Sequence, residues 1–372
     1  MYIDLIYTFY IALLTSAVLL ETFVRQTLSR QIKAFIIFVL ATITILLSGL
    51  RFETGSDWFP YLEHFESSSD SFEPGYMIIN DVLKNLTSNY TVFLLIIALP
   101  IYFIVPISKL NVKHQTFIFC GIIFQYFPVF LGGNRQMIAI LLTILSVNNF
   151  IVKQKLTFKA IIYALLATTF HASAIIILFS NVFISISIFL FNFIKKILRN
   201  KIMTNSKIIT MIVAVLGFIC LRFGLFILAG LLTKVLPFGN IEANLSTTNE
   251  VIGLDENQAK DIPILIERLL LSVFTFFRWR YLSKDWLSRY TVYMSVIYTV
   301  IFISYSDSFR IIAGRLSLYF RFADVLLYML IALSFKGKLY QILLLCFTLI
   351  MAFRLFLSLH LNYYFLPYQF AL

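Results

Sequence analysis

The sequence predicts an all-α fold, a polytopic bundle of helices that cross a membrane. Of the 372 residues, 60% are hydrophobic and only 13% are charged, and the mean hydropathy is +0.90. Soluble domains are roughly 45–50% apolar and about 25% charged. Apolar runs of about 18 residues or more, long enough to span a bilayer, recur along the whole chain. We therefore expect a single integral membrane domain over residues 1–372.

Hydropathy predicts about 12 transmembrane helices, within a range of about 10–14. The region 158–194 has an alternative interpretation, one span followed by a helix in the membrane interface. The first run has no basic segment before it, so we expect a spanning helix rather than a signal peptide. The predicted spans cover about residues 4–22, 34–50, 91–108, 116–131, 136–152, 158–177, 178–194, 208–232, 263–277, 290–306, 316–335 and 339–357.

The charges predict the orientation of the helices. Most of the 30 basic residues lie in alternate connections, after the odd-numbered spans, and the positive-inside rule makes those connections cytoplasmic. Both chain ends then face outward, with two longer and more acidic loops at about 51–90 and 233–262. Within the first loop, Ile79, Val82, Leu83 and Leu86 have helical spacing, which predicts a short helix on the membrane face over 75–86. The net charge of +12 thus reflects topology and indicates no nucleic-acid partner.

Several arginines do not fit this topology. Among them, Arg51, Arg135 and Arg315 lie at the outward ends of spans, and Arg321 lies inside an apolar run. Three alternatives compete: snorkelling to outer headgroups, an ion pair with a buried acid such as Asp324, and an incorrect span boundary. Because a guanidinium binds phosphate through two hydrogen bonds, several outward arginines suit a lipid-linked pyrophosphate.

Two further side chains are candidates for acid–base chemistry. Gly55 allows a tight turn that brings Asp57 near Arg51, where the carboxylate stays ionised and can act as a base or hold a sugar hydroxyl. The alternative is a turn that ends the helix, with a surface ion pair. His171 lies toward the outward end of its span. It is either a base or phosphate ligand, or a histidine bonded to a neighbouring helix.

Aromatic residues accompany these candidates. Tyr319 follows Arg315 by about one helical turn, so the two are expected on one face. Tyr368 lies in the aromatic C-terminal tail, where tyrosines can stack on sugars or anchor at headgroups. The three cysteines and four histidines have no metal-ligand spacing, and we find no nucleotide-binding loop, so we expect neither a metal nor a cofactor.

Together, these motifs resemble the EpsG/Wzy-type family of bacterial exopolysaccharide and O-antigen polymerases. Pro60, in the turn between Asp57 and Tyr61, departs from the family pattern. The resemblance is carried, in chain order, by Arg51, Gly55, Asp57, Tyr61, Glu73, Gly75, Tyr76, Asn134, Arg135, Gln136, Phe170, His171, Ser173, Ala174, Gly314, Arg315, Tyr319, Phe320, Pro367 and Tyr368.

The resemblance implies a glycosyltransferase of the bacterial cytoplasmic (inner) membrane, with its active site facing the periplasm. Such an enzyme transfers a glycan from undecaprenyl pyrophosphate onto the next lipid-linked oligosaccharide, without a metal and with inversion at the anomeric carbon. Its partners are membrane lipid, the lipid-linked oligosaccharides and a chain-length-determining co-polymerase. A flippase of lipid-linked oligosaccharide, an O-antigen ligase and a membrane acyltransferase remain the alternatives, although we find no repeated halves of the flippase kind.

The resemblance also implies roles for the candidate residues. Arg51, Arg135, Arg315 and Arg321 would bind the pyrophosphate, and Asp57 or His171 would be the base. The residues expected to line the glycan cavity are Glu73, Tyr319 and Tyr368.

Overall fold

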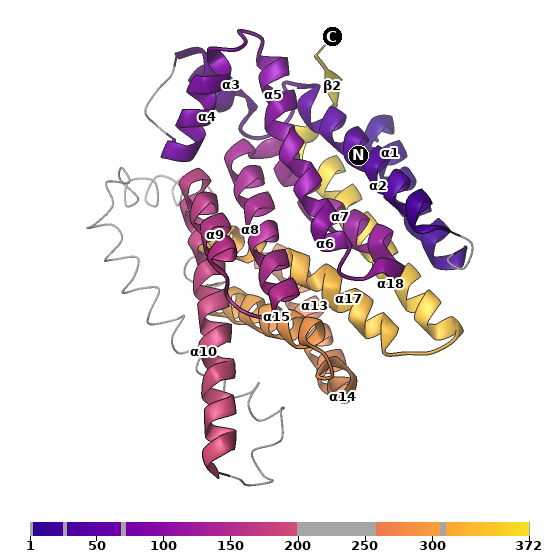
Figure 1. The fold of residues 1–372 in the computed structure, drawn as a ribbon. Helices are drawn as coiled ribbons and strands as arrows, with labels where there is room; N and C mark the ends of the chain where they lie inside the picture. The colour runs from indigo at the N-terminus through magenta and orange to yellow at the C-terminus, as the bar shows by residue number, and fades with distance from the viewer. Residues whose placement is uncertain (1–2, 25–27, 68–71, 199–257, 306–309, 372) are drawn as a thin grey trace. The chain divides into compact units, whose positions relative to one another are not determined.

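The computed structural model describes residues 3–24, 28–67, 72–198, 258–305 and 310–371 (Figure 1). Helices make up nearly all of the regular structure there, which confirms the predicted all-α membrane fold. The described chain divides into two compact units, Met1–Ser185 with Arg321–Leu372, and Ile186–Phe320. The prediction of a single membrane domain stays a prediction.

The first unit contains most of the helices. Several begin at a capping side chain: Asp4 accepts from Ile6 N–H at 2.9 Å, and Thr157 accepts from Ala160 N–H at 3.2 Å. Its elements are α1 (Leu5–Phe23), α2 (Arg30–Gly49), β1 (Arg51–Phe52), α3 (Trp58–Ser67), α4 (Pro74–Lys84), α5 (Tyr90–Ala98), α6 (Ile104–Ser108), α7 (Gln115–Gly132), α8 (Asn134–Lys153), α9 (Phe158–Phe170), the start of α10 (Ile175–Leu198), α17 (Arg321–Leu333), α18 (Lys338–His360) and β2 (Gln369–Phe370).

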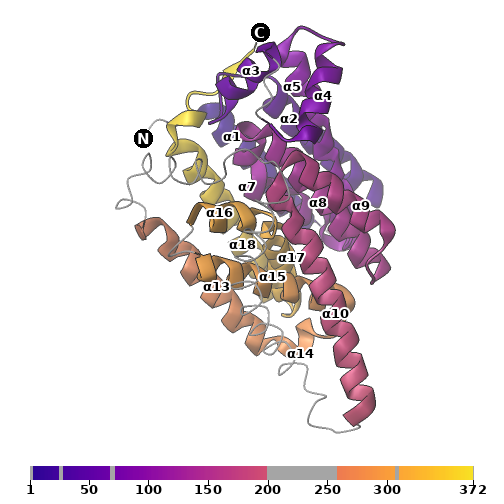
Figure 2. The same cartoon turned by 90° about the vertical axis from the view of Figure 1, so that its left-hand side faces the viewer.

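Helix α7 is the centre of this unit. In its apolar window 89% of the residues are buried, and it contacts α1, α2, α6, α8, α17 and α18. Gly121 permits close packing there, because a Cβ at this position would lie 2.4 Å from Cγ1 of Val325. Figure 2 shows α7, α8 and α9 side by side, and α9 packs mainly on α8.

The described residues contain eight helices long and apolar enough to cross a membrane, so the predicted count of 12 is not shown. The region 158–194 is divided differently from the prediction. Helix α9 has only 13 residues, about 20 Å of helix, and ends at Phe170 rather than at 177. Likewise α17 has 13 residues and starts after a break that follows α16, so 316–335 is not one helix. The predicted span 208–232 lies outside the described residues.

A helix is present within the first long loop: α4 ends at Lys84 rather than at 86, and its place on the membrane face stays a prediction. Its buried face carries Tyr76, Asn80 and Leu83, whereas Ile78 and Val82 are exposed. Helix α4 contacts α9, and the ring of its buried Tyr76 meets the rings of Tyr61 and Phe93. Most of the second predicted loop, 233–262, lies outside the described residues, and its last part begins helix α13 at Gln258.

The second unit contains the remainder of α10 with α13 (Gln258–Phe277), α14 (Trp279–Leu282), α15 (Trp286–Tyr305) and α16 (Arg310–Leu318). Within it, Arg268 of α13 is 1% exposed, and its guanidinium carbon lies 4.0 Å from the ring centroid of Tyr298. This buried cation was not singled out from the sequence, although its place inside an apolar run was a signal for it.

In the first unit, the two ends of the helices differ in chemistry. One end, called here the Lys33 end, carries Lys33, Lys113, Lys153 and Lys338, in agreement with the predicted clustering of basic residues. The opposite end, the Arg51 end, contains residue 51, the start of α8, the end of α9 and the chain's last residues.

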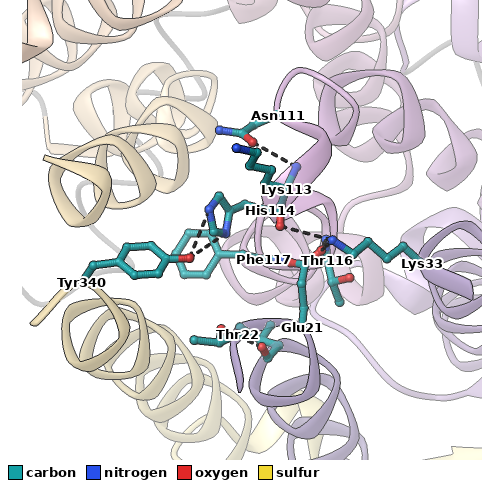
Figure 3. A network of polar contacts seen from close by, with 10 residues as sticks. Glu21, Thr22, Lys33, Asn111, Lys113, His114, Thr116, Phe117 and Tyr340 are labelled. Carbon is teal, nitrogen blue, oxygen red and sulfur yellow. Dashed lines mark hydrogen bonds and ion pairs between the residues drawn. The ribbon is translucent and has the colours of Figure 1, made fainter. Parts of the chain in front are cut away.

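A polar network lies at the start of helix α7, at the Lys33 end of the unit (Figure 3). The Glu21 carboxylate accepts hydrogen bonds from the N–H groups of Thr116 at 3.1 Å and Phe117 at 3.0 Å. It also lies 3.7 Å from the Lys33 ammonium, which donates to the Lys113 carbonyl. The carboxylate therefore satisfies N–H groups that have no partner within the helix.

Candidate functional site

The strand that carries Arg51 is held by the C-terminal tail. In the antiparallel pair of β1 and β2, Arg51 is opposite Phe370, and Ala371 N–H donates to the Leu50 carbonyl at 2.8 Å. Farther along, Gly55 N–H donates to the Tyr364 carbonyl at 2.8 Å. The tail thus sets the position of the segment that follows α2.

The turn predicted at Gly55 is present. Gly55 has φ +111°, and a Cβ there would lie 2.2 Å from the Leu131 carbonyl oxygen. Only glycine fits, because both the backbone angle and the space exclude a side chain. The turn therefore packs directly on the end of α7, next to the start of α8.

Arg51 is the most deeply buried charge at this end. Its side chain is among the largest fully buried ones, and the residue is 2% exposed. One terminal nitrogen donates to the Ser48 carbonyl, and the other donates to Oδ1 of Asn134 at 2.6 Å. Among the described residues, no acid forms an ion pair with Arg51. Burial lowers the pKa of this guanidinium, yet an arginine keeps its proton in proteins.

Neutral tyrosines surround this charge. Arg51 interacts electrostatically with Tyr61, Tyr76, Tyr90 and Tyr368. Burial raises the pKa of the Tyr61 and Tyr76 hydroxyls, so both stay protonated at neutral pH. Neither of them supplies a negative charge to Arg51. The result is a buried positive charge whose direct hydrogen-bond partners, the Ser48 carbonyl and the Asn134 amide oxygen, are uncharged.

Arg135 follows Asn134 in the first turn of α8 and has a different environment. Its Nη1 pairs with the Glu73 carboxylate, and its Nε donates to the Tyr61 hydroxyl at 3.3 Å. The guanidinium carbon lies 4.2 Å from the ring centroid of Phe72. The side chains of Arg135 and Glu73 are 23% and 14% exposed, so this ion pair is partly open to its surroundings.

The start of α8 adds positive potential. Gly133 precedes the 20-residue helix and provides no side-chain cap, and the Tyr61 hydroxyl accepts a hydrogen bond from the Arg135 N–H at 3.4 Å. The first N–H groups of a helix have no intrahelical partner, and the helix dipole is positive at this terminus. Arg51, Asn134 and Arg135 thus converge on a helix terminus that favours an anion.

His171 lies at the same end of the unit. It follows the last residue of α9, and its Nδ1 is 2.8 Å from the Ser173 hydroxyl. Gly75 of α4 packs against Thr169, since a Cβ at Gly75 would lie 2.4 Å from that hydroxyl. The segment that carries Glu73 is therefore packed on the turn that carries His171.

Asp57 precedes α3 and is half-buried. Its carbonyl accepts from Tyr61 N–H at 3.1 Å, and its charge is one of the causes that raise the pKa of the Tyr61 hydroxyl. Asp57 therefore lies one helical turn from the tyrosine that holds Arg135. Pro60 lies in the first turn of α3, where proline is tolerated.

Of the remaining candidates, two belong to the second unit and two to the first. Arg315 and Tyr319 belong to the second unit; helix α16 ends at Leu318, and Tyr319 is buried whereas Arg315 is exposed. Arg321 starts α17, whose next residue, Phe322, donates its N–H to the hydroxyl of Tyr126 at 3.0 Å. Because Tyr126 lies inside α7, Arg321 lies alongside that helix rather than at its end.

The sequence predicted that Tyr368 stacks on a sugar or anchors at headgroups, and both roles need an accessible ring. In the structure, Tyr368 is buried. Its hydroxyl donates to the Leu47 carbonyl at 2.7 Å, and its N–H donates to the Asp4 carboxylate at 2.9 Å. Its ring meets that of Tyr7 edge-on. These contacts fasten the tail to the helices beside Arg51.

Sequence reasoning passed over two asparagines at this site. Asn134 appeared only as part of a motif, yet it is fully buried and holds Arg51. Asn80 is also fully buried, and neither atom of its amide has a hydrogen-bond partner among the described residues. The sequence held one signal for Asn80: it is a polar residue one helical turn after Tyr76, on the face of α4 that is otherwise buried. Among those residues, no cluster of three His, Cys, Asp or Glu could hold a metal ion.

A family model described as EpsG matches residues 34–370, nearly the whole chain and every residue of this site. The chain belongs to the EpsG family. It is thus a multi-pass membrane protein of a family linked to exopolysaccharide synthesis. Comparison with curated proteins and with solved structures finds no match to this EpsG-family chain.

Proposed function

We propose that this EpsG-family protein polymerises lipid-linked oligosaccharides. It would transfer a glycan from undecaprenyl pyrophosphate to the next lipid-linked unit at the periplasmic face of the inner membrane. One observation supports this most strongly: Arg51 is a buried cation without an acidic partner among the described residues, beside the start of α8. A buried charge is costly unless it is paired, and a bound pyrophosphate supplies the missing negative charge.

The reaction requires few groups. The acceptor hydroxyl attacks the anomeric carbon, its proton passes to a base, and undecaprenyl pyrophosphate leaves with the bonding electrons. Arg51 and the α8 terminus stabilise the charge that develops on the leaving pyrophosphate. Asp57 and His171 are the candidate bases, since both lie at the Arg51 end. Arg315, Arg321, Tyr319 and Tyr368 remain candidates for pyrophosphate or glycan binding.

Arg51→Ala tests the proposal. In a strain that depends on this gene, deletion should leave a single repeat unit on its anchor, and the variant should lose the polymer ladder on a gel. We expect at least a hundredfold loss, about the effect of removing one donor that stabilises a developing oxyanion. Arg51→Lys, which keeps the charge but not the two-pronged geometry, should retain less than a tenth of the polymer.

Arg30→Ala is the matched control, because Arg30 is an exposed arginine at the start of α2. The control should keep a normal ladder at an equal amount of protein in the membrane. A normal ladder in Arg51→Ala would refute the pyrophosphate assignment. Loss of all glycan on deletion, including the single unit, would favour the flippase or the ligase.

A further inference from the structure

The Arg135–Glu73 pair contrasts with Arg51 in a way that bears on substrate binding. Both arginines lie at the start of α8, but only Arg135 is neutralised by an acid of the protein itself. A guanidinium binds a carboxylate and a phosphate through the same N–H groups in the same plane. One of those positions on Arg135 is therefore already occupied by an anion.

The surroundings of Arg135 leave little room for both anions. Tyr61 accepts from Nε at 3.3 Å, and Phe72 covers one face of the guanidinium with 4.2 Å between the guanidinium carbon and the ring centroid. Glu73 takes Nη1, and it comes from the segment that also carries Phe72. A phosphate that binds the Nη1–Nη2 edge of Arg135 must displace Glu73, whereas on the other edge Nε is already bonded to the neutral Tyr61 hydroxyl.

We infer that Glu73 is an internal counter-ion that competes with the substrate pyrophosphate for Arg135. This inference rests on the proposed function. Glu73 holds Arg135 in place and compensates its charge when no substrate is bound, and the pyrophosphate displaces it. The role differs from the glycan contact expected from the sequence, because it predicts that loss of the Glu73 charge strengthens pyrophosphate binding.

Glu73→Gln tests this inference. The amide keeps the size of the side chain and removes its charge, so inorganic pyrophosphate should bind the full-length protein in detergent about fivefold more tightly than it binds the wild type. Isothermal titration calorimetry at fixed ionic strength measures the two affinities. In the Arg135→Gln background, Glu73→Gln should give no gain, since the group for which the anions compete is absent.

Glu63→Gln is the matched control. Glu63 is an exposed acid of α3, and its removal changes the net charge of the same outer segment equally. The control should bind pyrophosphate within twofold of the wild type, which excludes a general effect of net charge. If Glu73→Gln does not enter the membrane, Glu73→Asp replaces it: the shorter carboxylate should also give tighter binding.

The outcomes separate the two proposals. Binding by Glu73→Gln that equals or falls below that of the wild type overturns the role of Glu73 and leaves the proposed function intact. A gain in pyrophosphate affinity that persists in the Arg135→Gln background also overturns the role of Glu73 and leaves the proposed function intact. Absence of pyrophosphate binding by the wild type and by every variant overturns both proposals.

Discussion

At the scale of the residue, charge compensation separates the two arginines at the start of α8. Arg135 has Glu73, whereas Arg51 has a carbonyl and an amide oxygen. A buried charge without an ionic partner is destabilising, so under the proposed function a pyrophosphate bound beside Arg51 would supply the missing compensation. Binding of pyrophosphate to the folded state should accordingly raise the melting temperature of the protein.

The turn at Gly55 gives a residue-scale prediction. Gly55→Ala forces a side chain into a positive-φ position and against the Leu131 carbonyl, so we expect the free energy of unfolding to fall by about 3 kcal/mol. Thermal unfolding in detergent measures the effect. Gly314→Ala is the control, because no atom of the described residues lies within 4 Å of a Cβ there. Equal melting temperatures for the two variants would contradict the tight packing of this turn on α7.

At the scale of the element, helix α7 depends on a residue from another helix. Its start is capped by Glu21 of α1 rather than by a side chain next to it in sequence. The same carboxylate balances Lys33 of α2, so one acid joins three helices at the Lys33 end (Figure 3). The interaction stabilises α7, the most buried helix of the first unit. The turn at Gly55 packs against the other end of this helix.

Glu21→Ala tests this arrangement. The variant leaves two N–H groups of α7 without their acceptor and removes the carboxylate that balances the Lys33 ammonium, and we expect a loss of about 3 kcal/mol in the free energy of unfolding. Glu21→Gln keeps one oxygen acceptor and should lose about half as much. Thermal unfolding in detergent compares the two. A melting temperature of Glu21→Ala that matches the wild type would show that the network adds nothing to stability.

At the scale of the whole molecule, the ends of the chain meet beside the site. Tyr368 binds Asp4 and Leu47, and β2 pairs with the strand that carries Arg51. The tail is therefore part of the scaffold of the first unit.

Tyr368→Ala tests the role of the tail. Removal of a buried ring and its hydrogen bond should lower the free energy of unfolding by about 3–4 kcal/mol and shorten or abolish the polymer ladder. Tyr363→Ala is the matched control, because Tyr363 lies in the same tail and is 73% exposed. The control should leave stability and polymer unchanged. A full ladder and an unchanged melting temperature in Tyr368→Ala would contradict the scaffold role.

The sequence by itself determined the membrane class, the all-α fold, the clustering of basic residues and the turn at Gly55. Each follows from composition or local pattern, since hydropathy and backbone geometry act over short stretches of chain. The sequence did not predict the helix boundaries within 158–194 and 316–335, because hydropathy stays high across the short breaks at His171 and at Tyr319.

Only the tertiary structure decided how the candidate residues are paired. Arg51 meets Asn134, 83 residues away, and Arg135 meets Glu73, 62 residues away. In the structure, Arg51, Asp57, Glu73, Arg135 and His171 lie at one end of the first unit, and the motifs did not indicate which of their charges are compensated. That depends on contacts between helices distant in sequence, and on burial, which sets the energetic cost of each charge.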